Sequence, residues 1–203
     1  MFITFEGGEG AGKSTLIDRL AKELAKKGWD VLTTRAPGGL KMGAKIRDLL
    51  LHSEKGEITP KAELFLFLAD RALHVDQEIK PALDAGKIVL CDRFNDSTVA
   101  YQGIARGLGE AEVARLCTFA SNGLKPDLTF YLDLDPNIGL SRAKNLGPSD
   151  RIESETLAFH QKIRQAYLQI AKEDPGRIHV IDAARDKDQV FKNAWKVVEH
   201  AFL

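Results

Sequence analysis

The sequence predicts an α/β fold in which a five-stranded parallel sheet carries helices on both faces. Short apolar runs alternate with longer amphipathic patterns along the 203 residues, which is typical of strands that alternate with helices. The run at residues 87–91 is continuously apolar after Lys87, as expected for a strand that is buried on both faces. A glycine-rich segment at residues 7–14 separates the first apolar run from the first helical pattern.

The first elements show how the assignment is made along the chain. Residues 2–5 are predicted to form a strand, and the following helix places Leu16, Leu20 and Leu24 on one face. Gly28 then occupies the position at which helices commonly end. Because no linker divides the chain, we expect a single domain over residues 1–203. The predicted strands are 2–5, 30–34, 87–91, 127–133 and 177–182, and the predicted helices are 14–27, 42–52, 61–83, 110–122, 153–172 and 188–201.

Composition narrows the class of protein. Apolar residues make up 44% of the chain, and the 29 basic residues equal the 29 acidic ones. A neutral chain lacks the field of a general nucleic-acid binder, so no nucleic-acid partner is expected. Cys91 and Cys117 form no CxxC pair and are expected to be reduced thiols. The sequence begins without a signal-peptide pattern and contains no membrane-length apolar stretch, so we expect a cytoplasmic protein without a membrane partner.

The glycine-rich segment fits the phosphate-loop pattern G-x-x-x-x-G-K-[ST]. Its glycines allow backbone angles at which successive N–H groups face phosphate oxygens, and the following helix adds its positive N-terminal end. Lys13 is expected to reach the β- and γ-phosphates, and the Ser14 hydroxyl to bind Mg²⁺. The residues expected to bind the ATP phosphates are Gly7, Gly8, Glu9, Gly10, Ala11, Gly12, Lys13, Ser14 and Thr15. The loop alone does not separate GTPases, ATPases and kinases.

Charged side chains also follow the second and third strands. Ligands of such sheets bind beyond the carboxyl ends of the strands, where Arg35 and the pair Asp92-Arg93 are found. Asp92 is suited to hold Mg²⁺, partly through water, and Arg93 is suited to a phosphate. Arg47 and Arg71 lie on other elements, so they could converge with Arg93 on one anion. The sequence therefore indicates a small phosphorylated acceptor.

Two further features concern the base of the acceptor and the closure of the site over ATP. Phe67 and Arg71 are four residues apart on one helix face, which suits the stacking and hydrogen bonding of a base. The basic stretch at about residues 141–152 begins as a helix and then reaches Gly147 and Pro148. Such a stretch predicts a mobile lid that closes over ATP.

Together these segments resemble bacterial thymidylate kinases, which are P-loop nucleoside monophosphate kinases, over nearly the whole chain. The most specific segment is D-R-F-N-D-S-T-V-A-Y-Q-G at residues 92–103, supported by T-R-A-P-G-G at 34–39, P-D-L-T at 126–129 and D-R-I-E at 150–153. The resemblance implies that the protein phosphorylates dTMP to dTDP with ATP and Mg²⁺ in dTTP biosynthesis. It also implies a homodimer.

The resemblance implies roles for individual residues. Phe67 would stack on thymine, Arg71 would bind a base carbonyl, and Thr98 and Gln102 would contact the base edge. Tyr101 would pack against the sugar. The implied catalytic residues are Lys13, Arg93, Arg142, Arg151 and Glu9. The implied substrate-binding residues are Glu9, Arg35, Pro37, Arg47, Phe67, Arg71, Arg93, Ser97, Thr98, Tyr101 and Gln102. The implied metal-binding residues are Ser14 and Asp92.

Two positions depart from the family pattern, and other functions stay open. Ala36 replaces a glutamate common in T-R-E-P-G-G, and Lys144 stands where an arginine is common, without its bidentate fork. Another P-loop nucleotide or nucleoside kinase is the nearest alternative. A non-catalytic P-loop switch is less favoured, because the sequence holds no N/T-K-x-D guanine motif. Intact Lys13, Ser14 and Asp92-Arg93 argue against an inactive scaffold.

Overall fold

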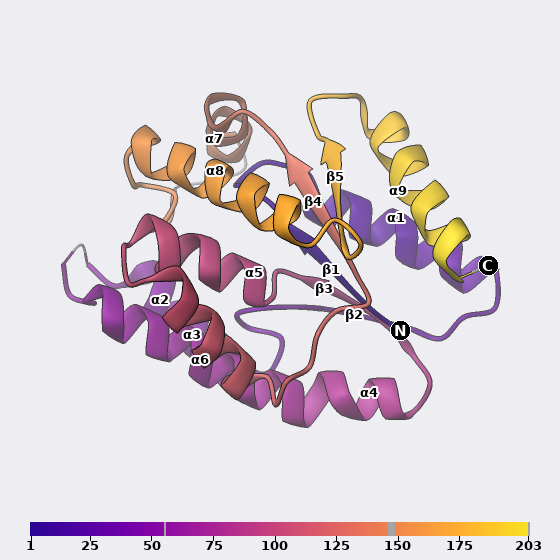
Figure 1. Cartoon of the computed structure of the whole chain (residues 1–203), viewed down its shortest axis with the longest axis horizontal. Coiled ribbons are helices and arrows are strands. Elements are labelled where there is room, and N and C mark those ends of the chain that lie inside the picture. The colour runs from indigo at the N-terminus through magenta and orange to yellow at the C-terminus, as the bar shows by residue number, and fades with distance from the viewer. Residues whose placement is uncertain (55, 146–148, 203) are drawn as a thin grey trace.

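A parallel sheet of five strands, in the order β2-β3-β1-β4-β5, forms the centre of the computed structural model (Figure 1), which confirms the predicted fold class. The structure describes residues 1–54, 56–145 and 149–202. The strands are β1 (Phe2–Glu6), β2 (Val31–Arg35), β3 (Ile88–Asp92), β4 (Leu128–Asp133) and β5 (Ile178–Asp182). All five lie within a residue or two of the predicted ranges.

Helices cover both faces of the sheet (Figure 1). On one face, α1 and α9 bury a cluster that includes Leu20, Leu24 and Val198 against the strands. On the other face, α8 and the helices around α6 bury a second cluster that includes Tyr131 and Tyr167. The helices are α1 (Lys13–Lys26), α2 (Lys41–His52), α3 (Pro60–His74), η1 (Val75–Ile79), α4 (Lys80–Asp84), α5 (Asn95–Thr98), η2 (Val99–Ala105), α6 (Glu110–Ala120), α7 (Pro136–Lys144), α8 (Leu157–Glu173) and α9 (Lys187–Phe202).

The helix predicted over residues 61–83 contains a wider turn. It runs as α3, the π-helical segment η1 and α4 without a break. Pro81 near the start of α4 cannot donate to the helical ladder, and a π-helical turn accommodates such an interruption. Within this region Thr34 on β2 bonds both His74 (2.8 Å) and Glu78 (2.5 Å), which ties the helix to the edge of the sheet.

Three helical regions differ from the prediction, and one of them is α7, which begins at Pro136 and not near residue 141. The helix expected from residue 153 begins at Leu157, because Thr156 caps it and accepts from the Phe159 N–H at 3.3 Å. Before this cap, the Asp150 carboxylate accepts from the backbone of Ile152 and Glu153 and holds a separate turn. Residues 95–105, for which no helix was predicted, form α5 and the π-helical η2. α5 is only four residues long, and the period of η2 departs from the usual 3.6 residues, so the pattern that marks an α-helix is absent.

Strand register brings the carboxyl ends of β1 and β3 together. Phe5 lies opposite Asp92, and Glu6 lies opposite Tyr131 of β4. The loop after β1 therefore starts beside the Asp92-Arg93 pair. Cys91 and Cys117 are both buried and unpaired. Among the residues that the structure describes, no helix combines the length and the hydropathy of a membrane span.

Candidate active site

The phosphate loop follows β1 and ends in the first turn of α1, as predicted. Gly10 and Gly12 have positive φ angles of 65° and 89°. A Cβ on Gly10 would collide with the carbonyl oxygen of Gly139 in α7, so the loop and α7 meet backbone to backbone. Gly12 precedes α1 without a side-chain cap, which leaves the first N–H groups of the helix available to an anion.

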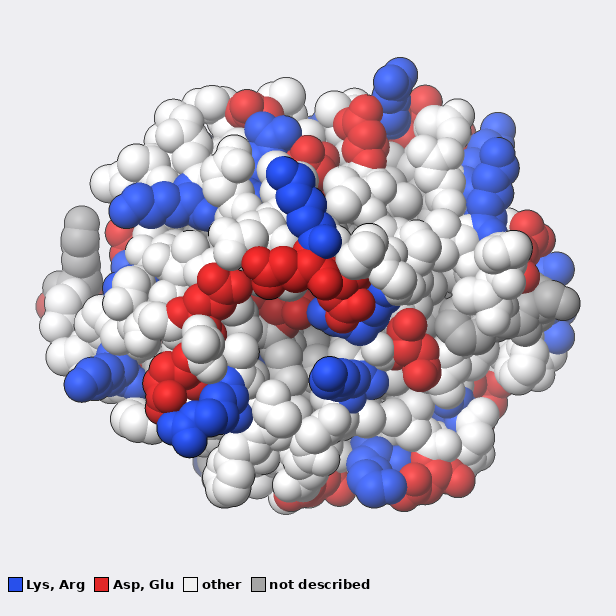
Figure 2. All heavy atoms as spheres, in the orientation of Figure 1, with Lys and Arg blue, Asp and Glu red and all other residues white. Residues whose placement is uncertain are grey.

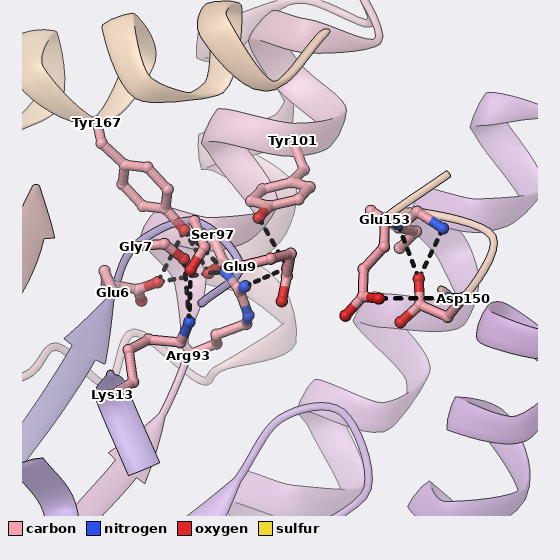
Figure 3. A network of polar contacts seen from close by, with 12 residues as sticks. Glu6, Gly7, Glu9, Lys13, Arg93, Ser97, Tyr101, Asp150, Glu153 and Tyr167 are labelled. Atoms are coloured by element: carbon pink, nitrogen blue, oxygen red, sulfur yellow. Dashed lines mark hydrogen bonds and ion pairs between the residues drawn. The ribbon is translucent and has the colours of Figure 1, made fainter. Parts of the chain in front are cut away.

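Lys13 is buried inside the loop. Its Nζ donates to the carbonyl oxygen of Gly7 at 3.2 Å, as Figure 3 shows. It also donates to the carbonyl oxygen of Gly8 at 3.0 Å. Burial lowers the pKa of Lys13, and the nearby charge of Arg93 lowers it further. The ammonium group is therefore held by neutral carbonyls in a site that favours a negatively charged ligand.

A cavity of about 650 Å³ opens over this loop, and we call it the phosphate cavity. It contains Lys13 together with four of the arginines in the chain, which gives it the charge expected of a polyphosphate site. Elsewhere charges are mixed: on the face in Figure 2, the described basic and acidic side chains are interspersed. The lining residues are Glu9, Gly10, Ala11, Gly12, Lys13, Ser14, Thr15, Arg35, Ala36, Arg47, Asp92, Arg93, Arg142, Ala143 and Glu153.

Ser14 and Asp92 both line the phosphate cavity and suit a magnesium ion. The Asp92 Oδ1 atom is buried and has no hydrogen-bond partner among the described residues, although a buried carboxylate oxygen normally has one. Mg²⁺ prefers one or two protein oxygens together with phosphate oxygens and water. The residues present therefore fit the ion. Groups of three or more His, Cys, Asp or Glu side chains that could hold another metal are absent from the described residues.

Arg93 lies at the centre of the polar network in Figure 3. It has a φ of 69°, in the left-handed region that non-glycine residues seldom adopt, which is a form of strain common at functional sites. Its guanidinium donates to Glu9 Oε1 at 2.6 Å and to the hydroxyls of Ser97 and Tyr167 at 3.3 Å. Burial alone would raise the pKa of Glu9, but the charges of Arg93 and Lys13 outweigh it and hold that pKa below its ordinary value. Glu9 is therefore an ionised partner for Arg93.

Glu6 supports the turn that carries Arg93, and sequence reasoning missed it. This fully buried carboxyl group accepts from the Phe94 N–H at 2.7 Å, from the Tyr167 hydroxyl at 3.2 Å and from the Ser97 hydroxyl. Burial and the nearby charge of Asp96 raise the pKa of Glu6 to about 7. The available signal was an acidic residue at the end of an otherwise buried strand, but its partners lie far away in the sequence.

A second cavity, of about 100 Å³, adjoins the first, and we call it the aromatic cavity. The two cavities share Glu9, Ala36, Arg47, Arg93 and Glu153. Of the predicted substrate-binding residues, all except Arg35 line the aromatic cavity, whereas Arg35 lines the phosphate cavity. The members are Glu9, Pro37, Arg47, Phe67, Arg71, Arg93, Ser97, Thr98, Tyr101 and Gln102. Residues from segments far apart in the sequence thus line one cavity, as was expected of them from the sequence.

Arg71 is buried in the wall of the aromatic cavity. Its guanidinium carbon lies 4.2 Å from the centre of the Phe94 ring, a cation–π arrangement. The Nη1 atom is buried and unpartnered among the residues that the structure describes. A buried donor without a partner costs free energy, which a ligand that accepts a hydrogen bond would recover. Ala36, the departure from the family pattern, is buried and lines both cavities.

The two predicted lid arginines lie in different places. Arg142 on α7 lines the phosphate cavity and donates to the Ala183 carbonyl at 3.3 Å. Arg151 does not line that cavity; it donates to the Leu50 carbonyl at 2.8 Å and to Glu63 at 2.7 Å. Residues 146–148 of the predicted lid lie outside the described residues.

A third cavity, of about 330 Å³, extends from the phosphate loop toward the C-terminal helix, and it was not predicted. It shares Ala11, Gly12, Thr15 and Arg142 with the phosphate cavity. Its remaining lining residues are Leu16, Arg19, Ala183, Arg185, Asp186, Lys187 and Val190. The loop after β5 carries no recognisable motif, and only the fold places it beside the phosphate loop.

A parallel sheet with a phosphate loop at the end of β1 and a second ligand cavity beside it defines a P-loop phosphotransferase. A family model described as thymidylate kinase matches residues 5–194. The chain is 48% identical to a thymidylate kinase of Protochlamydia amoebophila (strain UWE25), over 98% of this chain and 92% of that protein. It is 50% identical to a thymidylate kinase of Nitratidesulfovibrio vulgaris (strain DSM 19637 / Miyazaki F), over 98% and 95%. The chain therefore belongs to the thymidylate kinase family.

A solved structure agrees with this assignment. The crystal structure of thymidylate kinase from Ehrlichia chaffeensis superposes with a TM-score of 0.81 at 33% sequence identity, and 98% of each chain is covered. The predicted resemblance, fold class and enzyme class are therefore confirmed. The roles of individual site residues stay predictions.

Proposed function

We propose that this protein transfers the γ-phosphoryl group of ATP to dTMP, with Mg²⁺ accompanying the nucleotide. One observation carries the proposal beyond family membership: the phosphate cavity and the aromatic cavity meet at Glu9, Arg47 and Arg93. A nucleotide with its base in the aromatic cavity would have its phosphate beside these arginines. Donor and acceptor phosphates would then meet at one point, which is the positioning that phosphoryl transfer requires.

On the donor side, the loop backbone and Lys13 would hold the β- and γ-phosphates. Lys13 would exchange the carbonyls of Gly7 and Gly8 for phosphate oxygens. The third cavity continues from the same loop and is the place for the donor nucleoside. Mg²⁺ held by Ser14 and Asp92 would neutralise part of the phosphate charge.

On the acceptor side, Arg47 and Arg93 would bind the monophosphate, and Arg93 would exchange its bond to Glu9 for a phosphate oxygen. Phe67 would stack on the base, and Arg71 would donate its free Nη1 to a base carbonyl. An acceptor phosphate oxygen then attacks the γ-phosphorus in line, and the bond to the β–γ bridging oxygen breaks to release ADP. The acceptor phosphate is already anionic, so the proposed mechanism needs neither a strong general base nor a covalent intermediate.

Arg142 and Arg151 remain the proposed lid residues. The place of Arg142 in the phosphate cavity supports a role in offsetting charge on the transferring group. Arg151 would contribute only after it left Glu63, to which it is bound.

A coupled ADP-release assay with ATP, Mg²⁺ and a panel of acceptors tests the proposal. The panel holds dTMP, dUMP, UMP, dCMP, AMP, GMP and thymidine. We expect strong turnover with dTMP, weaker turnover with dUMP and almost none with thymidine, which lacks the phosphate that Arg47 and Arg93 would bind. A protein that binds ATP but phosphorylates no monophosphate would refute the proposal and favour a switch or scaffold.

The proposed enzyme acts as a homodimer. Phe65 on α3 and Phe119 on α6 are 60% and 84% exposed, and these two helices pack against each other. Large exposed aromatic side chains are typical of protein contacts. Light scattering after gel filtration should give twice the chain mass, and Phe119→Glu should shift the protein toward the monomer. A wild-type protein that stays monomeric at micromolar concentration would exclude the dimer. The cytoplasmic location stays a prediction.

A further inference from the structure

A buried carboxylate, Glu63 on α3, lies behind the aromatic cavity. Only 1% of its surface is exposed. Its Oε1 accepts from Gln102 Nε2 at 2.8 Å and from Arg106 Nε at 3.1 Å, and its Oε2 accepts from Arg151 Nη2 at 2.7 Å. Burial alone would raise the pKa of Glu63, but the hydrogen bonds from Arg106 and Gln102 hold it below the ordinary value. Glu63 is therefore ionised and can only accept hydrogen bonds.

This carboxylate decides which way the Gln102 amide faces. The Gln102 side chain is buried and lines the aromatic cavity. An amide ordinarily offers a donor end or an acceptor end, and its two orientations look alike. Beside an ionised carboxylate only the –NH₂ end can face Glu63, so the carbonyl Oε1 is the atom left for a ligand. The hydroxyl of Thr98 can rotate to donate or accept, so it imposes no such polarity.

The aromatic cavity therefore combines a fixed acceptor with a fixed donor. Arg71 can only donate, and its Nη1 is buried without a partner among the described residues. A base edge that carries a carbonyl next to an N–H complements this pair, as do the O4 and N3–H of thymine and uracil. Cytosine presents an unprotonated N3 there, which would leave two acceptors facing each other, a costly arrangement in a buried site.

We propose that Glu63 is a specificity-determining positioning residue: it fixes the Gln102 amide so that the cavity selects pyrimidines with an N3–H and rejects cytosine. The inference rests on the proposed function and deepens it. Glu63 touches no substrate in this account and acts through Gln102. Its bonds to Arg106 and Arg151 keep its charge compensated and so keep it an acceptor.

The test compares kcat/KM for dTMP with that for dCMP in the wild type, in Glu63→Gln and in a control, Glu155→Gln. A neutral glutamine at position 63 can accept or donate, so it would no longer dictate the orientation of Gln102. We expect the dTMP/dCMP ratio to fall by about 10- to 100-fold, the range for one mispaired buried polar group. Calorimetric Kd values for both nucleotides supply the ratio where turnover with dCMP is too slow.

The ratio separates this role from a structural one. Loss of charge beside Arg151 acts on both acceptors alike and cancels in the ratio. Glu155 also pairs with Arg106, at 2.5 Å, but it makes no bond to Gln102, so its replacement should leave the ratio unchanged. A folded Glu63→Gln enzyme with the wild-type ratio would overturn the inference.

A second variant covers the case in which Glu63→Gln fails to fold. Gln102→Met keeps Glu63 and both of its arginine partners but removes the acceptor. We expect it to lose dTMP activity about 10-fold or more and to gain dCMP activity, because two acceptors would no longer face each other. Equal effects on both acceptors would overturn the inference. A wild-type enzyme that ignores dTMP would instead refute the proposed function itself.

Discussion

The donor and acceptor sides of this site are built in different ways. The donor side is a run of consecutive residues, 7–14, whose backbone and one lysine provide the contacts. The acceptor side is assembled from side chains on α2, α3, η2 and the turn after β3, and the carboxylates of Glu9 and Glu63 hold two of them in place. A site made of backbone depends on glycines and local geometry, whereas a site made of side chains depends on partners distant in the sequence.

The largest effect on kcat/KM is expected from a substitution on the donor side. Lys13→Ala should lower kcat/KM by 10²–10⁴-fold, on the order of the loss of one charge-stabilising donor. The loss should be equal for every acceptor, because Lys13 serves the donor phosphates. Steady-state kinetics with dTMP and dUMP measure it. Lys22→Ala, an exposed lysine on the same helix, is the control. A folded Lys13→Ala enzyme with near-wild-type turnover would contradict the mechanism.

The next effect concerns Glu6, the buried carboxyl group that supports the turn carrying Arg93. The folded-state pKa of Glu6 is raised to about 7 from an ordinary 4.5, so the folded protein holds a proton that the unfolded chain has lost between these pH values. The free energy of unfolding should therefore fall as the pH rises from about 4.5 to 7, by about 3 kcal/mol from this group. Glu6→Gln should remove that contribution, so the variant should lose less stability over this range.

Urea unfolding at a series of pH values measures this slope. Glu199→Gln, at an exposed position on α9, should keep the wild-type slope. If Glu6→Gln and the wild type lost stability in parallel, Glu6 would be ionised throughout and the account of its burial would be wrong.

A smaller effect should appear on the acceptor side alone. Arg93→Lys keeps the charge but loses the planar fork that contacts Glu9, Ser97 and Tyr167. We expect about a 10- to 100-fold rise in KM for dTMP, with little change in the Kd of ATP. Kinetics and calorimetry give the two values, with Arg115→Lys on the exposed face of α6 as the control. If Arg93→Lys weakened the binding of dTMP and of ATP equally, Arg93 would not belong to the acceptor side alone.

The smallest effect concerns the backbone of the loop. Gly10→Ala places a Cβ against the Gly139 carbonyl at a positive φ, so it should lower the free energy of unfolding by about 1–3 kcal/mol. Gly8→Ala is the matched control, because a Cβ there meets nothing within 4 Å. Thermal unfolding compares the two variants. Equal stability would show that the contact between the loop and α7 tolerates an extra carbon.

The same contrast explains what the sequence could predict. The phosphate loop and Asp92-Arg93 were found because each lies in a contiguous motif at the end of a strand. Phe67 and Arg71 were predicted to bind a base from their spacing on one helix face, whereas Thr98 and Gln102 were predicted only through the family resemblance. The partners that orient them were not predicted: Glu6 beneath Arg93 and Glu63 behind Gln102 depend on contacts across 91 and 39 positions of the chain.

The predicted start of α8 and the absence of a predicted helix at residues 95–105 were wrong for a related reason. The start of α8 is set by the Thr156 cap, which competes with a helical pattern that extends back to residue 153. In residues 95–105, the short helix α5 ends at Thr98 and the π-helical η2 begins at Val99, which hides the ordinary period. Local propensity is weak at such places, and tertiary contacts decide the backbone.

The close approach of Gly10 and Gly139 has a mechanical consequence. The phosphate loop is fixed to the sheet by β1, and α7 rests on it through two residues without side chains. The base of α7 therefore cannot move closer to the phosphate loop, and Arg142, three residues further on, is held within one turn of this contact. A side chain at either glycine would push the loop and α7 apart and carry Arg142 away from the phosphate cavity.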